Sequence, residues 1–227
     1  MIEENLRSIL SELPSDVKLV AVSKFHPFTD VLSAYQAGQR RFGENRPQEF
    51  AAKAVQLPQD IEWHFIGHLQ TNKLKLVLPY ASLVESIDSR HLLDLVNYWG
   101  MTNGKTISVL LELHLGAEET KSGFSESEIE ALLSEYVDAR TSGLKNPFPN
   151  IRFCGIMGMA SHTEDVDVIE ADFARIQAFK KHLDSTFPQL SDFRELSIGM
   201  SGDWQIALRH GATIVRIGTA IFGPRAY

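Results

Sequence analysis

Lys24 ends an apolar run, VKLVAVSK, which predicts a buried β-strand. Because side chains alternate along a strand, Lys24 shares one face with Val20 and Val22. Partial burial disfavours the ammonium form and lowers the pKa of a lysine, and the free amine can then form a Schiff base with a carbonyl compound. Lys24 is therefore a candidate covalent anchor, although a side chain extending from the strand end into solvent would fit the same pattern.

Two glycine-rich segments have the composition of a phosphate site. In SIGMSGDW, Ser201 and Gly202 precede a predicted helix and offer a hydroxyl and open backbone N–H groups to an anion. In RIGTAIFG, Gly218 permits close backbone approach and Thr219 adds a second hydroxyl. The simpler alternative is that these residues only form turns and helix caps. Asp203 would repel an anion unless its carboxylate caps the helix or faces away.

Arg216, in TIVRIG, has the parity of Ile214 in a predicted strand and is expected to point into the interior. A buried guanidinium stays charged and needs partners, so an ion pair with an acid at a strand end is one interpretation. The candidate acids are Glu85, Glu112 and Glu195. The other interpretation is a hydrogen bond to the ring nitrogen of a heteroaromatic cofactor. A lysine that can react with an aldehyde, a phosphate site and an arginine that can face a pyridine nitrogen match three groups of one cofactor. Together they indicate pyridoxal 5′-phosphate (PLP).

Strand-like and helix-like segments alternate along the chain, which predicts an α/β protein with a parallel sheet. The predicted strands are 18–23, 41–43, 63–66, 83–86, 107–113, 151–157, 195–198 and 213–217. The predicted helices include 30–37, 47–55, 90–98, 126–139, 166–183 and 203–209, several of them closed by a glycine such as Gly38, Gly100 or Gly211. About eight such units favour one (β/α)₈ barrel domain over residues 1–227, with a doubly wound open sheet as the alternative. A barrel would gather Lys24 and both glycine-rich segments at one mouth.

The composition of the 227 residues narrows the class of protein. A net charge of −7 gives no electrostatic reason to expect nucleic acid or an anionic membrane as the main partner. Cys154 is the only cysteine, so no intrachain disulfide can form, and its apolar setting favours an inert buried thiol in a reducing compartment. No segment has the pattern of a signal peptide or the length of a membrane span, and we expect a cytoplasmic protein.

Seven motifs along almost the whole chain resemble the pyridoxal phosphate homeostasis protein family, which is similar to the barrel domain of fold-type III enzymes such as alanine racemase. These motifs are VAVSKF around Lys24, RRFGENRPQEF (40–50), WHFIGHLQTNK (63–73), KSGF (121–124), GIMGMA (155–160), SIGMSGDW (197–204) and VRIGTAIFG (215–223). The resemblance implies that Lys24 carries PLP as a Schiff base, that Arg216 faces the pyridine nitrogen and that Asn45 lies near the ring. It also implies a set of phosphate ligands, namely Ser201, Gly202, Gly218 and Thr219.

Four residues depart from the family pattern or suggest another chemistry. His114 stands where relatives more often carry asparagine, and Gly158 stands where threonine is usual, so both positions could change the rim of the pocket. His64 and His68 have the i, i+4 spacing of some zinc ligands, but they span a predicted strand and loop rather than a helix face. We therefore expect histidines that pack or form hydrogen bonds, and no metal site.

The expected function is PLP binding for intracellular vitamin B6 homeostasis, by storage or transfer to PLP-dependent apoenzymes. A cation opposite the ring nitrogen weakens PLP as an electron sink. The resemblance implies that the racemases add a second domain and a partner subunit, and a chain of this length leaves no room for that domain. We expect a monomeric carrier without catalytic residues. The alternatives are a racemase-like PLP enzyme, a Schiff-base aldolase acting on a phosphorylated sugar, and an interaction protein in which Lys24 is structural.

Overall fold

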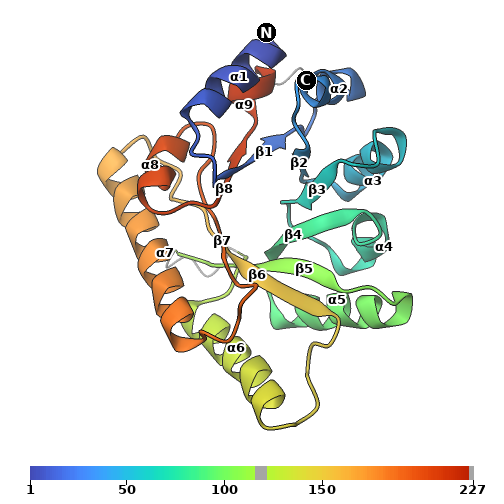
Figure 1. The fold of residues 1–227 in the computed structure, drawn as a ribbon, viewed down its shortest axis with the longest axis vertical. Coiled ribbons are helices and arrows are strands. Elements are labelled where there is room, and N and C mark those ends of the chain that lie inside the picture. Colours follow the sequence, from blue (N-terminus) through green and yellow to red (C-terminus); the bar gives the residue numbers. More distant parts are fainter. Residues whose placement is uncertain (116–121, 225–227) are drawn as a thin grey trace.

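The computed structural model describes residues 1–115 and 122–224, so Lys121 of the KSGF motif lies outside the described residues. Eight parallel strands close into a barrel, in which each strand pairs with the next and β8 pairs with β1 (Figure 1). The strands are β1 (Lys18–Val22), β2 (Arg41–Glu44), β3 (Glu62–Phe65), β4 (Ala81–Ile87), β5 (Ile107–Glu112), β6 (Ile151–Met157), β7 (Glu195–Ser197) and β8 (Ile214–Ile217). The predicted (β/α)₈ barrel is confirmed, and the open-sheet alternative is wrong.

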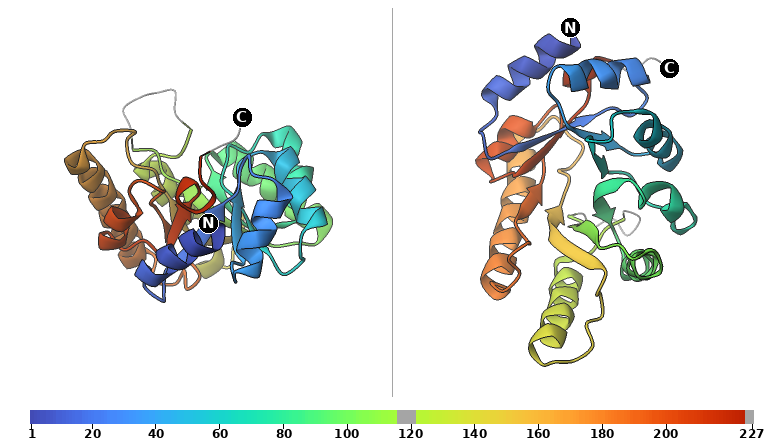
Figure 2. Two further views of the ribbon diagram at one scale, coloured as in Figure 1. Left: turned by 90° about the horizontal axis from the view of Figure 1, so that it is seen from above. Right: turned by 45° about the vertical axis from the view of Figure 1, so that its right-hand side comes forward.

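Helices surround the barrel on its outer side (Figure 2). Those that follow strands are α2 (Phe28–Gln36), α3 (Pro47–Gln56), α4 (Leu74–Val77) after the 3₁₀ turn η1 (Thr71–Lys73), α5 (Arg90–Asn103), α6 (Glu126–Thr141), α7 (Val166–Thr186), α8 (Trp204–Arg209) and α9 (Thr219–Phe222). An additional N-terminal helix, α1 (Ile2–Glu12), packs against α9 and α2, and Asn5 Nδ2 donates to Ile221 O at 3.0 Å. The sequence patterns missed α1, α4 and α9.

The prediction that Gly100 closes a helix is wrong. Helix α5 continues through Gly100 and ends at Gly104, which has a φ of 61°. A side chain at position 100 would bring its Cβ within 2.7 Å of the Lys105 carbonyl oxygen and 2.8 Å of Asn150 Cβ. The absence of a side chain at Gly100 therefore serves close packing in the last turn of the helix, whereas Gly104 supplies the left-handed conformation that ends it.

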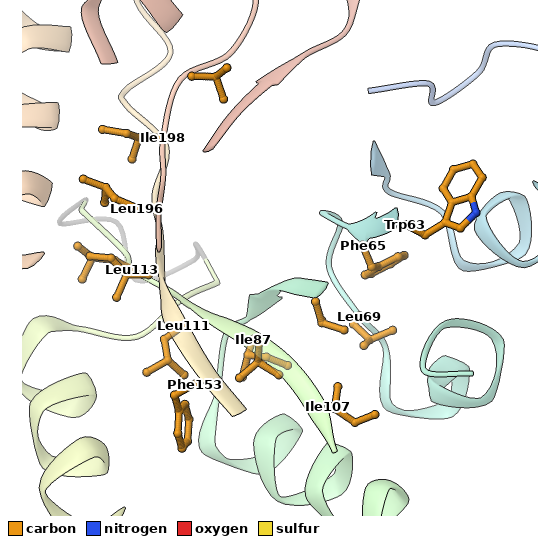
Figure 3. Packing of buried hydrophobic residues seen from close by; sticks show 14 of the residues in the cluster. Trp63, Phe65, Leu69, Ile87, Ile107, Leu111, Leu113, Phe153, Leu196 and Ile198 are labelled. Carbon is orange, nitrogen blue, oxygen red and sulfur yellow. The ribbon is translucent and has the colours of Figure 1, made fainter. Parts of the chain in front are cut away.

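The core has two layers, one on each side of the strands. The larger layer lies between strands and helices and contains residues such as Trp63, Phe65 and Phe153 (Figure 3). A smaller cluster fills the barrel interior and consists of Val20, Leu83, Leu110, Met157 and Ile214, with half-buried Cys154 packed against it. Val20 and Ile214 therefore face inward, which confirms the parity argument for β1 and β8. Burial raises the pKa of the Cys154 thiol, so the thiol stays protonated and is a poor nucleophile.

The close approach of β6 to β7 predicts an unequal effect of two alanine substitutions. Gly155 has a φ of 153°, and a Cβ there would lie 1.9 Å from the Glu195 carbonyl oxygen. Gly104 has open space around it, so Gly104→Ala should cost only about 1 kcal/mol of unfolding free energy, from its backbone conformation. Gly155→Ala must in addition push β6 from β7, and we expect a loss of more than about 2 kcal/mol. Urea unfolding followed by circular dichroism measures both, and equal losses would contradict the packing argument.

Candidate functional site

The loops after β7 and β8 meet at the C-terminal mouth of the barrel. The Gly218 N–H donates to Ser201 Oγ at 3.1 Å, and the Arg216 N–H donates to the Gly199 carbonyl at 2.9 Å. Gly202 and Thr219 lie beside these residues and are exposed. The structure thus brings together the four residues expected to bind phosphate, and leaves hydroxyl and backbone donors open to solvent.

Lys24 lies at the same mouth, just beyond the end of β1, and is half-buried. A Cβ at Gly218 would lie 3.0 Å from the Val22 carbonyl oxygen and 3.3 Å from Val22 Cβ. Glycine therefore allows the β8 loop to pack directly on the end of β1. This close packing places the expected anchor next to the expected phosphate segments.

The Asp203 carboxylate is turned into its own loop. Its Oδ1 accepts the Met200 N–H at 2.5 Å, and it makes no side-chain cap bond to helix α8, which begins at Trp204 rather than at residue 203. Its negative charge lies near enough to Arg216 to raise the pKa of the guanidinium, against the larger effect of burial. The carboxylate is thus already engaged within the loop.

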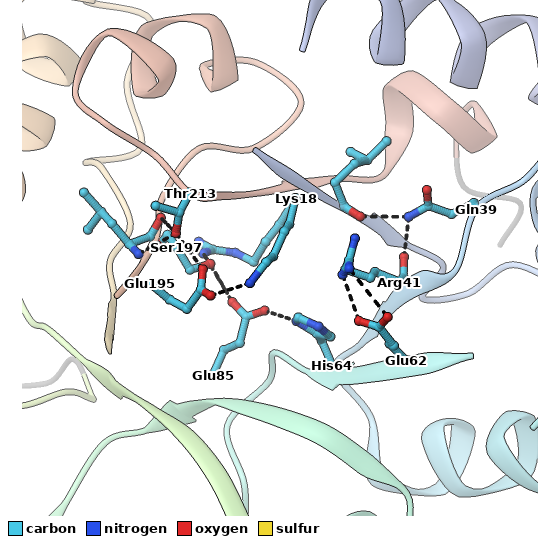
Figure 4. A network of polar contacts seen from close by, with 12 residues as sticks. Lys18, Gln39, Arg41, Glu62, His64, Glu85, Glu195, Ser197 and Thr213 are labelled. Atoms are coloured by element: carbon cyan, nitrogen blue, oxygen red, sulfur yellow. Dashed lines mark hydrogen bonds and ion pairs between the residues drawn. The ribbon is translucent and has the colours of Figure 1, made fainter. Parts of the chain in front are cut away.

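A chain of polar contacts crosses the barrel interior beneath the mouth (Figure 4). Arg216 donates from its two terminal nitrogens to the Ser197 carbonyl (2.9 Å), Ser197 Oγ (2.5 Å) and the Gly158 carbonyl (3.1 Å). Ser197 Oγ donates to Glu85 Oε2 at 2.6 Å, and Glu85 Oε1 lies 2.6 Å from His64 Nδ1. Bonds from His64 and Ser197 and the charge of Arg216 together outweigh desolvation and lower the pKa of the buried Glu85 carboxyl. The network therefore keeps the Glu85 carboxylate ionised beside the Arg216 guanidinium.

Arg216 points into the interior, as predicted, and its acidic partner is Glu85 at 3.7 Å. Glu195 forms an ion pair with Lys18 instead, so it is not the partner. Burial lowers the pKa of the Arg216 guanidinium, but an arginine keeps its charge. The described residues accept three of its five N–H donors, which leaves donors available for another group.

Asn45 follows β2 at the mouth, and its side-chain Oδ1 is buried without a hydrogen-bond partner among the described residues. Buried polar atoms are nearly always bonded, so this oxygen favours a ligand that brings a donor. Gly67, which sequence reasoning did not single out, allows the β3 loop to press on Asn45, because a Cβ at Gly67 would lie 2.2 Å from the Asn45 carbonyl oxygen. The only sequence signal for this contact is the glycine itself in HFIGH.

The histidines form hydrogen bonds, as predicted. His64 contacts Glu85, and His68 Nδ1 lies 2.8 Å from Asp88 Oδ2. In the part of the chain that the structure describes, no three His, Cys, Asp or Glu side chains gather as metal ligands would. At Gly158, a Cβ would lie 2.7 Å from Ile176 Cδ1, the end of a flexible side chain, so a threonine there would require Ile176 to shift. The N–H of His114 donates to the Phe124 carbonyl.

Glu112, at the end of β5, is a proton-binding group at the mouth that the sequence suggested only as an arginine partner. Burial raises its carboxyl pKa to about 7, and the charge of Asp88 adds to the shift, while Arg216 and His68 oppose it. The side chain is therefore poised to gain or lose a proton near neutral pH.

Comparison with known proteins identifies the family. The family model described as alanine racemase, N-terminal domain, matches residues 1–226. A pyridoxal phosphate homeostasis protein from Vibrio alginolyticus is 36% identical over 241 residues, an alignment that covers 100% of this chain and 98% of the relative. The chain belongs to the pyridoxal phosphate homeostasis protein family.

Solved structures agree with this family assignment. PipY of Synechococcus elongatus PCC7942, with PLP bound, is 35% identical and has a TM-score of 0.86, over 98% of this chain and 100% of that chain. Alanine racemase from E. faecalis is 15% identical with a TM-score of 0.71, and this chain covers 57% of it, which shows a shared fold alone. No helix among the described residues of this family member is long and apolar enough to span a membrane.

The raised pKa of Glu112 predicts how the stability of the cofactor-free protein depends on pH. The folded-state pKa of about 7 lies above the ordinary value of 4.5 for a glutamate, so folding favours the protonated carboxyl. That contribution is fully present below pH 4.5 and is lost as the pH rises to 7. Glu112→Gln, which cannot ionise, should be more stable than the parent at pH 8, with the difference shrinking towards pH 4.5. Urea unfolding across this pH range measures the free energy of unfolding of both proteins. A difference between them that does not change with pH would contradict the raised pKa of Glu112.

Proposed function

We propose that this chain is a single-domain, monomeric PLP carrier that holds PLP as a Schiff base on Lys24 and stores it or passes it to apoenzymes. Its main support is that Lys24, the Ser201–Gly218 pair and Arg216 converge on one barrel mouth from three strand ends. The names of the relatives and the PLP bound to PipY support the same cofactor for this chain.

The donors at the mouth fit a phosphate group. Ser201 Oγ accepts the Gly218 N–H, so the hydroxyl proton of Ser201 can be donated to a phosphate oxygen. Open space surrounds the Cα of Gly202, and Thr219 is exposed, so their N–H groups and the Thr219 hydroxyl can approach the remaining oxygens. The phosphate would thus be held by neutral donors, which suits reversible binding.

Lys24 supplies the covalent link. Its Nζ would join the cofactor aldehyde through a C=N bond, and the aldehyde oxygen would be lost as water. Hydrolysis reverses the step and returns the free amine and aldehyde. An anchor of this kind retains a reactive aldehyde while leaving it available to another protein.

The position of Arg216 favours a role in carrying PLP rather than a role in catalysis. PLP, when bound, supplies an electron sink whose strength grows when its ring nitrogen is protonated. A guanidinium can only donate hydrogen bonds, and its fixed charge disfavours a second cation on that nitrogen. The contacts of Arg216 with Ser197 and Gly158 hold it in this role, so carbanion chemistry would be hard at this site.

An absorbance titration with PLP tests the anchor and the phosphate site together. We expect a visible Schiff-base band in the parent protein, no band in Lys24→Ala, and affinity reduced by about tenfold in Ser201→Ala, because one donor to a charged group is lost. Borohydride reduction followed by peptide mass analysis should label Lys24. An absent band in the parent, or unchanged labelling in Lys24→Ala, would refute the proposal.

A racemase-like activity remains the second candidate, because Glu112 places a proton-binding group with a pKa of about 7 at the mouth. The holoprotein should be incubated with a panel of amino acids in D₂O while exchange of the α-hydrogen is followed by NMR. We expect no stereospecific exchange above that of free PLP. Rapid exchange that is lost in Glu112→Gln would instead establish an enzyme.

A further inference from the structure

The backbone around Lys24 is bonded on both sides to side chains of helix α3. Lys53 Nζ donates to the Ser23 carbonyl at 2.7 Å, and the Phe25 N–H donates to Glu49 Oε1 at 2.9 Å. The φ and ψ angles of Lys24 are rotations between these two peptide groups. Fixing both groups therefore fixes the direction in which the Lys24 side chain leaves the backbone.

The turn that carries Lys24 adopts a backbone conformation that needs such support. Phe25 has a φ of 68°, and it is the only residue other than glycine with a positive φ in the part of the chain described. A bulky residue in this region is strained and persists only where surrounding contacts determine it. Glu49 holds its N–H, and the Arg46 guanidinium lies 4.3 Å from the centre of its ring.

Lys53 is a buried cation whose bonding capacity is fully used. Its side chain is 3% exposed, and besides Ser23 it donates to Glu44 Oε1 at 2.6 Å and Glu49 Oε1 at 2.8 Å. The fully buried Glu44 also accepts from the Ser23 hydroxyl at 2.7 Å. A buried charge with three directed hydrogen bonds permits one arrangement of the groups around it. The network thus joins α3 and β2 to the residue immediately before Lys24.

We propose that Lys53 and Glu49 are positioning residues, which lock the peptide groups on either side of Lys24 so that its amine meets the cofactor aldehyde. This inference rests on the proposed function of Lys24. Neither side chain needs to contact the cofactor. They act through the backbone, and a misplacement of the amine by about 1 Å is enough to weaken a covalent step strongly.

A second buried lysine provides a matched control. Lys180 on α7 is also nearly buried, and its Nζ donates to Asp184 Oδ1 at 2.6 Å and to the Phe193 carbonyl at 3.1 Å. Like Lys53, it joins a carboxylate four residues away on its helix to a backbone carbonyl. Phe193 precedes β7, so this contact lies at the end of the barrel opposite the mouth. Removing the Lys180 amine tests the general cost of losing a buried ammonium.

The experiment compares binding of PLP with binding of pyridoxine 5′-phosphate, which has an alcohol in place of the aldehyde and cannot form a Schiff base. We expect Lys53→Met and Glu49→Ala to lose at least about tenfold in PLP affinity while binding pyridoxine 5′-phosphate as the parent does. Lys180→Met should bind both as the parent does. Glu49→Gln keeps an oxygen that can accept the Phe25 N–H and should restore most of the PLP affinity.

The proposal is overturned if Lys53→Met and Glu49→Ala bind PLP as Lys180→Met does, or if they lose affinity for both ligands equally. Should Lys53→Met fail to fold by circular dichroism, the comparison of Glu49→Ala with Glu49→Gln decides, because the Glu49 side chain is 22% exposed and tolerates change. Lys24→Ala separates the two hypotheses. Unchanged borohydride labelling in that variant refutes the Schiff base itself, whereas lost labelling there with intact binding in the α3 variants refutes only positioning.

Discussion

The pairing of the first strand with the last is the constraint on which the candidate site depends. Register contacts run from Lys18 opposite Ile214 to Ala21 opposite Ile217, and Gly218 continues the contact by lying against Val22. Closure brings an amine from one end of the chain to a guanidinium and a hydroxyl-rich loop from the other. In an open sheet these groups would lie on opposite edges, and no single ligand could reach them.

Two buried polar networks support this mouth, one beneath Arg216 and one behind Lys24. Each places an ion pair in a low-dielectric interior, where charge is tolerated only when it is well bonded. The buried side-chain atoms left without a partner in the described part of the chain are Glu44 Oε2 and Asn45 Oδ1, which are neighbours in sequence at the end of β2. Burial raises the pKa of Glu44, in keeping with an oxygen that lacks a donor. Two buried acceptor oxygens therefore lack a donor here, among the residues that the structure describes. One of them belongs to Asn45, which the family resemblance places near the cofactor ring.

The alternation of strand-like and helix-like segments predicted most of the barrel, although short strands such as β2 and β7 carry no run of apolar residues. The inward direction of Arg216 followed from the parity of Ile214, because alternation is a local property of a strand. Gly100 was misread because its role depends on Asn150, a contact that no local rule contains. The network of Lys53 was likewise invisible, since nothing in the spacing of α3 shows that its amine reaches the Ser23 carbonyl. The sequence named residues that gather at the mouth, and it named Glu85 among the possible partners of Arg216, but it did not show the groups behind Lys24.

The Arg216 network sets the chemical character of the mouth as well as its geometry. Glu85 neutralises the guanidinium, and the bonds of Glu85 to His64 and Ser197 keep the carboxylate ionised, so the pair adds little net charge to the interior. Within this pair the guanidinium donates hydrogen bonds but does not release its proton, so it would not protonate a ring nitrogen. Rigid bonding to Ser197 and Gly158 prevents that cation from turning away. Under the proposed function, a site built in this way would accept the pyridine ring and weaken its capacity to stabilise a carbanion, which would suit a protein that holds a reactive cofactor without consuming it.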